Sequence, residues 1–188
     1  MKKIFFLLCL ILSLSAAAET KTVQMLEGGI KGGFTTPLGS YHHSKGEISM
    51  MLGLEGRYNF EDTPISAGLI LELTSACHKF DMGKYYDTQN NRTLIFAAVG
   101  EYNFRQGHKV NPYGAVALGF GSNDIVGDKV YDADDSCLLF SPRIGVEFLY
   151  HIRLETGINI CRIGFNNYYI SLGFVIGGRP KKRYEFRK

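Results

Sequence analysis

The chain has 188 residues, which is enough for one domain, with 45% hydrophobic residues and a formal charge of +3. This composition excludes a disordered chain, and no run after the N-terminus approaches the roughly 20 apolar residues that a membrane helix needs. Much of the positive charge lies at the two ends of the chain, so the basic balance does not indicate nucleic acid binding.

The segment Met1–Ala18 has the three parts of a secretory signal peptide. Lys2 and Lys3 form the charged region, Ile4–Leu14 is the apolar region, and an Ala-Ala-Ala sequence supplies a cleavage site near Ala18. The alternative is an N-terminal membrane anchor, which the shortness of the apolar run disfavours. We therefore expect an exported protein whose main domain spans residues 19–178.

Residues 23–34 form the first predicted strand, because an apolar face alternates with a face that carries Glu27 and Lys31. The next strand, 47–60, keeps the same two-residue period over its whole length. Its apolar face consists of Ile48, Met50, Leu52, Leu54, Gly56, Tyr58 and Phe60. The segment is longer than a typical globular strand of about five or six residues.

Further segments repeat this alternation and bring the total to about eight strands, each near the 9–11 residues that cross a bilayer when tilted. They are 65–77, 93–104, 112–121, 138–150, 152–161 and 167–177. The connections at 37–46, 78–92 and 122–136 are longer than those at 61–64, 105–111 and near His151. Long external loops and short periplasmic turns are expected of outer-membrane barrels, although the fourth external connection, near 164–166, is short.

A soluble β-sandwich also alternates, with its apolar face turned inward. A membrane barrel is favoured because the strands are long, the apolar face ends in aromatic residues beside the short turns, and the other face carries ionisable residues in mid-strand. The aromatic residues are Tyr58, Phe60, Tyr102, Phe104, Phe148 and Tyr150. We predict an all-β fold, an antiparallel up-and-down transmembrane β-barrel with both termini on the periplasmic side.

The ionisable residues in mid-strand predict the contents of the lumen. They are Glu27, Lys31, Glu55, Arg57, Glu72, Glu101, Arg143, Glu147, Arg153 and Glu155. With about eight strands the interior is only wide enough for side chains, and an unpaired buried charge costs several kcal/mol. We therefore expect acids and bases to pair in a packed polar lumen with a structural role, which argues against a diffusion channel.

Export leaves three cysteines, Cys77, Cys137 and Cys161, in an oxidising compartment. Cys77 and Cys137 fall near external strand ends and could form a disulfide if their Cα atoms approach within about 7 Å. Free thiols are the default expectation. No cysteine spacing fits a metal site, and we expect neither a metal nor a cofactor.

Polar residues of the predicted external loops are the candidates for contact with a surface partner. They are His42, His43, His78, Asp132, Asp134 and Asp135. A Ser–His pair at the outer rim could support acyl hydrolysis, and clustered Asp residues suit Ca²⁺ or Mg²⁺, but no local motif defines either site. The basic tail, 179–188, is expected in the periplasm, either as a disordered end or in contact with anionic lipid or the cell-wall polymer.

The C-terminal half resembles a known family. The segments Ser141–Phe148, Arg153-Leu154 and Tyr169–Gly178 are similar to the small outer-membrane β-barrel family of the OmpA/OmpX type. The resemblance covers the mature chain to about Gly178, and it implies insertion by the outer-membrane assembly machinery, which reads the last strand. The chain departs from the family pattern because the basic tail follows where a terminal aromatic residue is usual.

Together these observations predict a monomeric integral protein of the outer membrane of a Gram-negative bacterium, in contact with outer-membrane lipid and lipopolysaccharide. We expect no enzymatic activity and a structural, envelope-integrity or surface-interaction role through the external loops. Two alternatives stay open: a hydrolase or acyltransferase that modifies lipid A at the outer leaflet, and a small pore.

Overall fold

The computed structural model describes residues 22–39, 44–81, 86–126, 135–161 and 164–180. The strands in these ranges are β1 (Leu26–Pro37), β2 (Ser44–Glu47), β3 (Ser49–Asn59), β4 (Ile65–Asp81), β5 (Tyr86–Asn103), β6 (Val110–Val126), β7 (Asp135–Phe148), β8 (Ile152–Asn159) and β9 (Asn167–Gly177). Over the same ranges no helix is long and apolar enough to cross a membrane.

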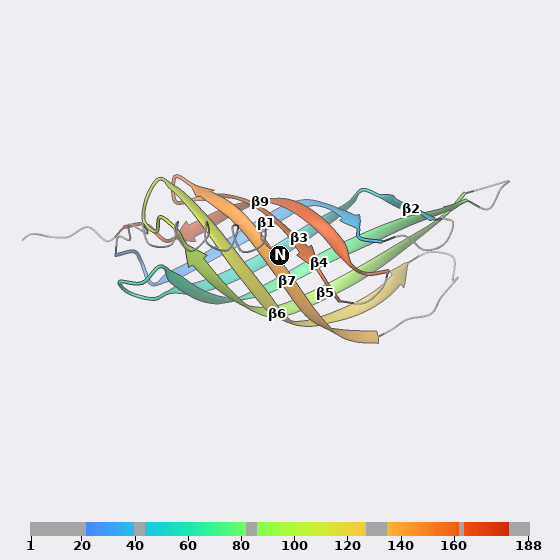
Figure 1. The fold of residues 1–188 in the computed structure, drawn as a ribbon, viewed down its shortest axis with the longest axis horizontal. Coiled ribbons are helices and arrows are strands. Elements are labelled where there is room, and N and C mark those ends of the chain that lie inside the picture. Colours follow the sequence, from blue (N-terminus) through green and yellow to red (C-terminus); the bar gives the residue numbers. More distant parts are fainter. Residues whose placement is uncertain (1–21, 40–43, 82–85, 127–134, 162–163, 181–188) are drawn as a thin grey trace, which may run out of the picture.

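All of these strands except β2 close into a barrel, which Figure 1 shows from the side with its strands strongly tilted. Each pairs antiparallel with its neighbours along the chain, and pairing of β1 with β9 completes the ring. Closure gives every barrel strand two partners, as a bilayer requires because it offers backbone groups no hydrogen bond. The predicted antiparallel up-and-down barrel is confirmed.

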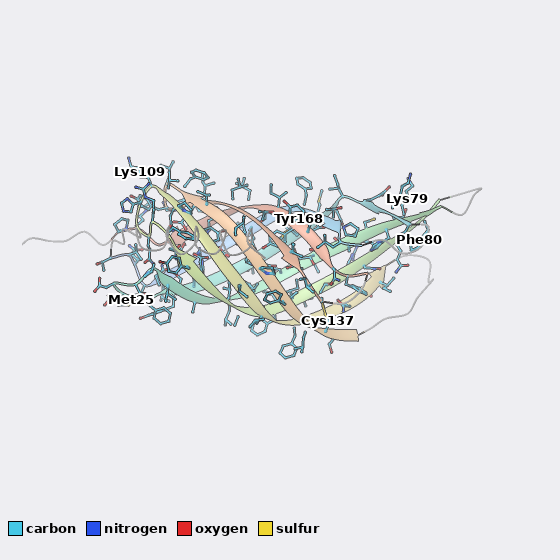
Figure 2. All side chains as sticks on the ribbon, viewed as in Figure 1. Met25, Lys79, Phe80, Lys109, Cys137 and Tyr168 are labelled. Atoms are coloured by element: carbon cyan, nitrogen blue, oxygen red, sulfur yellow. A yellow bond between two sulfur atoms is a disulfide. The ribbon has the colours of Figure 1, made fainter. Side chains whose placement is uncertain are left out.

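Alternate side chains point outward into lipid and inward into the lumen, as the two-residue period predicted. In β3, Met50 and Leu52 are 71% and 67% exposed, whereas Met51 between them is 1% exposed. Figure 2 shows the outward side chains surrounding the ribbon over its whole length. The apolar outer surface has no protein core to pack against, so its solvent is the hydrocarbon of a membrane.

The strand predicted over 47–60 is divided at Ile48. β2 pairs Ser44 with Phe80, and β3 pairs Leu52 with Leu73, so the register relative to β4 shifts by one residue between the two strands. Such a shift is a β-bulge. β2 is therefore an extension of β3 that follows the outer part of β4, and it adds no strand to the barrel wall.

The described parts of the predicted external loops at 78–92 and 122–136 are strand. β4 continues to Asp81 and β5 begins at Tyr86, while β6 continues to Val126 and β7 begins at Asp135. The polar composition of these stretches indicates that they extend beyond the lipid, where water solvates their side chains. The backbone pairing between the strands continues through them. The β4–β5 hairpin reaches furthest at one end of the molecule (Figure 1).

The opposite end carries the short turns and both ends of the described chain. Tyr58 packs edge-on against Phe60, and Tyr102 packs edge-on against Phe104, each pair at 5.2 Å between ring centroids. The backbone N–H of Gln24 donates to the Arg179 carbonyl at 3.0 Å, so the first residue of the predicted tail still pairs with the N-terminal segment. The predicted signal peptide and residues 181–188 of the tail lie outside the described residues.

Candidate functional site

The lumen holds two groups of charged side chains, one above the other along the barrel axis. One group lies nearer the end where the β4–β5 hairpin projects, and it is here called the outer charge cluster. It consists of Lys31, Glu72, Arg143 and Glu155. Lys31 Nζ lies 2.6 Å from Glu72 and 2.7 Å from Glu155. Arg143 Nη1 lies 2.9 Å from Glu72 and 3.5 Å from Glu155. Two cations therefore face two carboxylates, and the cluster is balanced.

Two tyrosines complete the outer charge cluster. The hydroxyls of Tyr113 and Tyr169 donate to the Glu155 carboxylate at 3.1 Å and 2.9 Å. Both rings need space that inward-facing glycines provide. A Cβ atom on Gly145 would lie 2.4 Å from the Tyr113 hydroxyl, and one on Gly157 would lie 2.8 Å from the Tyr169 hydroxyl. Any larger residue at either glycine would displace a ring that holds Glu155.

The second group, here called the periplasmic charge cluster, consists of Glu27, Glu55, Arg57, Glu101, Glu147 and Arg153. Arg57 contacts Glu27 at 2.7 Å and Glu101 at 2.9 Å. Arg153 contacts Glu101 at 2.7 Å and Glu147 at 3.6 Å. Two guanidinium groups thus serve four carboxylates, so this cluster carries an excess of acid.

The two clusters together bring all ten predicted lumen residues into ion pairs. Their burial is nearly complete, and even Glu55 has a side chain only 8% exposed. The gap bordered by Lys31, Glu55 and Tyr113 is too small for a water molecule. Because desolvation makes an unpaired buried charge costly, these contacts hold the strands in one arrangement. Along the described residues, the barrel is closed at its middle.

A chain of hydrogen bonds lies below the periplasmic charge cluster, near the short turns. Asn111 donates to Asn103 at 2.7 Å, Asn103 to Ser66 at 3.0 Å, and Ser66 to Asn59 at 2.6 Å. Asn59 in turn donates to Glu27 at 3.1 Å. These residues were not predicted as a site, and the sequence signal that could have found them is their inward position at strand ends.

One wall of the lumen is apolar, which the prediction of a polar lumen did not foresee. The cluster consists of Ile70, Ile95, Ala97, Val99, Tyr113, Ala115, Ala117 and Leu139. Most of these residues lie on β4, β5 and β6. In β4, Ile70 is an apolar residue on the face that otherwise carries small or polar residues. This wall borders the charged groups directly, because the Arg153 guanidinium lies 3.8 Å from the centroid of the Tyr113 ring, which places hydrocarbon rather than water beside the charge.

The described part of the connection between β8 and β9, here called the inward-folded connection, fills the outer end of the lumen. The carbonyl of Gly164 accepts a hydrogen bond from Asn91 at 2.7 Å and lies 3.1 Å from Nε2 of His78. Asn167 donates to Thr74 at 3.3 Å, and Phe165 is buried. β4 and β5 lie across the ring from β8 and β9, so the connection crosses the mouth of the barrel.

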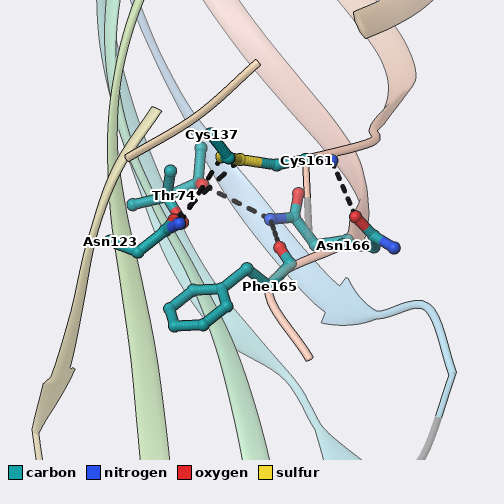
Figure 3. Close-up of a disulfide and its surroundings, with 8 residues drawn as sticks. Thr74, Asn123, Cys137, Cys161, Phe165 and Asn166 are labelled. Atoms are coloured by element: carbon teal, nitrogen blue, oxygen red, sulfur yellow. Dashed lines mark hydrogen bonds between the residues drawn. A yellow bond between two sulfur atoms is a disulfide. The ribbon is translucent and has the colours of Figure 1, made fainter. Parts of the chain in front are cut away.

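A disulfide between Cys137 and Cys161 ties this connection to the outer end of β7 (Figure 3). Their Cα atoms are 5.6 Å apart, because the isolated pairing of Phe140 with Ile160 continues the β7–β8 ladder towards them. The predicted bridge between Cys77 and Cys137 is wrong, since β4 and β7 are not neighbours in the ring. Cys77 is a free cysteine, whereas the default expectation of free thiols is wrong for Cys137 and Cys161.

The residues predicted to contact a partner from the external loops differ in where the structure places them. His42, His43, Asp132 and Asp134 lie outside the described residues, and Asp135 begins β7, where its backbone pairs with Asn123. The prediction for His78 is wrong, because its side chain is 0% exposed and faces the inward-folded connection. His78 lies an even number of positions after Glu72 in β4. The two side chains therefore lie on the same face of the strand, the one that points into the barrel.

A closed ring of antiparallel strands with an apolar outer surface and a polar, ion-paired interior is an integral membrane β-barrel. The family comparison agrees with this class, since the outer membrane protein beta-barrel domain matches residues 4–176. The chain therefore belongs to the outer membrane protein beta-barrel family, and it is an integral outer membrane protein.

Solved structures of outer-membrane barrels resemble the chain at low sequence identity. Ail of Yersinia pestis is 13% identical, with 81% of this chain and 99% of that chain covered and a TM-score of 0.45. The N-terminal barrel of Pseudomonas aeruginosa OprF is 13% identical, with 82% and 99% covered and a TM-score of 0.46. Pseudomonas aeruginosa OprG is 14% identical, with 85% and 97% covered and a TM-score of 0.45. A search of curated proteins found no match.

Proposed function

We propose that the protein is a surface-interaction protein of the outer membrane, in which a sealed barrel holds a contact surface above the lipid. The contact surface, here called the projecting sheet, consists of β2 and the outer parts of β4, β5 and β6. The observation that carries the proposal is the length of β4, β5 and β6, which have 17, 18 and 17 residues where 9–11 are needed to cross a bilayer.

The lipid-facing residues of the β4–β5 hairpin end at the pair formed by Leu73 and Leu94. Beyond it the two strands stay paired as far as Asp81 and Tyr86, which corresponds to about 25 Å of additional strand. The inward face of this extension is buried against the inward-folded connection. Its outward face is polar, with Arg92 exposed on β5.

The neighbouring elements support the projecting sheet on both sides. On one side, the exposed ion pair between Lys79 and Glu47, at 3.4 Å, joins β4 to β2. On the other side, the pairing of β5 with β6 continues from Arg92 and Asp124 to Asn90 and Val126. A sheet braced in this way presents a fixed polar surface to a partner, and the closed lumen gives no support to the small-pore alternative.

The test separates the projecting sheet from the barrel. In a trimmed variant, residues 79–88 are replaced by Asn-Gly, which joins the paired residues His78 and Gln89 through a two-residue hairpin turn. Both this variant and the wild type are returned to a strain that lacks the protein, and complementation is scored under envelope stress and in surface-adhesion assays. Heat-modifiable gel migration verifies that each barrel has folded.

We expect the trimmed variant to fold and to fail in complementation. If it folds and complements fully, the surface-interaction proposal is wrong and the role lies in the barrel, as an envelope-integrity function would require. A control variant, Lys79→Gln, keeps the length of the hairpin and removes only the exposed ion pair, which contributes at most about 1 kcal/mol. Because Lys79 itself lies on the projecting sheet, we expect this variant to fold like the wild type and to complement more fully than the trimmed variant.

A further inference from the structure

The two turns at the end opposite the projecting sheet enclose a pocket. It has a volume of about 380 Å³ and lies between the β5–β6 turn and the β7–β8 turn. Its lining residues are Arg105, His108, Lys109, Val110 and Tyr150. Figure 2 labels Lys109 at the end of the barrel opposite Lys79. This end carries the short turns, which outer-membrane barrels turn towards the periplasm.

The chemistry of the pocket favours an anion. Arg105 and Lys109 carry full positive charges at exposed positions, His108 adds ring nitrogens, and Tyr150 adds a phenol. A guanidinium group matches the geometry of phosphate oxygens, and an ammonium group acts on them as a point charge. The acids of this rim, Glu61 and Asp62, lie in the β3–β4 turn and do not line the pocket.

The pocket lies at the lower margin of the lipid-facing surface. Val110 pairs with Phe148 across β6 and β7, and the two side chains are 44% and 38% exposed on the outer face. Leu149, the next residue, is 58% exposed. The cationic pocket therefore borders an exposed apolar surface at Val110, which is the arrangement that the headgroup and acyl region of a phospholipid would require.

The backbone of the β7–β8 turn holds Tyr150 beside Lys109 at a cost. Leu149 and Tyr150 have φ values of 53° and 67°, in the left-handed region that Asn and Gly usually occupy in such turns. The Leu149 N–H donates to the Lys109 carbonyl at 2.7 Å, which fixes one turn against the other. Strained non-glycine residues are retained mainly where the surroundings or a function require them.

We propose that this pocket binds the phosphodiester group of an anionic phospholipid in the periplasmic leaflet of the outer membrane. Arg105, His108 and Lys109 hold the phosphate oxygens, Tyr150 donates its hydroxyl, and the first part of an acyl chain lies against Val110. The site is independent of the projecting sheet, so the inference goes beyond the proposed surface function and can fail or succeed separately from it.

Native mass spectrometry of the purified full-length mature protein tests the proposal. The protein is mixed in detergent with equal amounts of phosphatidylglycerol and phosphatidylcholine, and the ratio of the two lipids retained is measured. The test variant is Arg105→Gln with Lys109→Gln. The matched control, Lys45→Gln with Lys79→Gln, makes the same charge change at the outer end. Heat-modifiable migration shows which proteins have folded.

We expect the wild type and the control to retain phosphatidylglycerol preferentially. In the test variant the ratio falls by about twenty-fivefold, since each of the two basic side chains near an anionic surface changes partitioning about fivefold. If the double variant does not fold, Lys109→Gln alone is expected to give about a fivefold fall. An unchanged ratio in a folded pocket variant, or an equal fall in the control, would overturn the proposal. Displacement of the lipid by inorganic phosphate would also overturn it, because the site would then take free phosphate.

Discussion

The two charge clusters of the lumen are built from the same residue types but differ in balance. In the outer charge cluster, Lys31 and Arg143 each contact both carboxylates, and two tyrosine hydroxyls hold Glu155 as well. In the periplasmic charge cluster, Arg57 and Arg153 are shared among four carboxylates. One cluster has no spare charge, whereas the other has an excess of acid.

The difference indicates how each half of the barrel is stabilised. Every group of the outer charge cluster is needed for neutrality, and this half is also closed by the disulfide and the inward-folded connection. The periplasmic charge cluster lies next to a chain of amide side chains, and Asn59 donates to Glu27 there. Loss of one acid should therefore cost much stability in the outer half and little in the periplasmic half.

The largest effect is expected for Glu72→Gln in the outer charge cluster. Glu72 is fully buried and contacts both Lys31 and Arg143, so its neutralisation leaves two cations with one carboxylate. Breaking a buried ion pair costs about 3–5 kcal/mol. The free energy of unfolding is measured by urea titration in lipid vesicles with gel migration as the signal, because the chain has no Trp. A loss below about 1 kcal/mol would contradict the importance given to charge balance.

The disulfide is expected to have the next largest effect. Cys137 and Cys161 are separated by 24 residues, and closing a loop of this size stabilises a fold by about 3 kcal/mol. We expect Cys137→Ser with Cys161→Ser to lower the urea midpoint, and reductant to move the wild type to the same value. Cys77→Ser is the control and should unfold like the wild type. Thiol labelling of the unreduced mature chain at more than one cysteine would contradict the assigned pairing.

Much of the fold could be predicted because a barrel strand has a strict period of two. Once the strand 47–60 was assigned, parity alone placed Glu55 and Arg57 inside and Leu52 outside. The same argument placed the other charged residues in the lumen, since ionisable side chains in mid-strand cannot face lipid. Parity does not specify which acid meets which base, because partners such as Arg143 and Glu72 come from strands that are not adjacent.

The features that the sequence did not predict correctly share one physical origin, because they depend on contacts across the ring of strands. The pairing of Cys137 with Cys161 depends on the order of strands, and the burial of His78 depends on a connection from the opposite wall. The glycines opposite Tyr113 and Tyr169 give no sequence signal, since spacing does not show which ring fills which gap. Polar composition also failed to distinguish a loop from a hairpin that has left the membrane.

The smallest effect is expected for Glu147→Gln, which matches the chemistry of Glu72→Gln in the other half of the barrel. Glu147 meets Arg153 only at 3.6 Å, and Arg153 keeps its closer contacts with Glu101 and Glu55 when Glu147 is neutral. The substitution removes one of the surplus negative charges of the periplasmic charge cluster. We expect the free energy of unfolding to change by less than about 1 kcal/mol, in either direction.

The comparison of Glu147→Gln with Glu72→Gln is informative because both replace a buried carboxylate by an amide of nearly the same shape. Cavity formation and lost packing are therefore similar in the two variants, and the difference in their free energies of unfolding reports the balance of charge around each position. Equal losses in both would mean that burial alone sets the cost. A larger loss for Glu147→Gln would mean that the periplasmic charge cluster needs all four of its carboxylates.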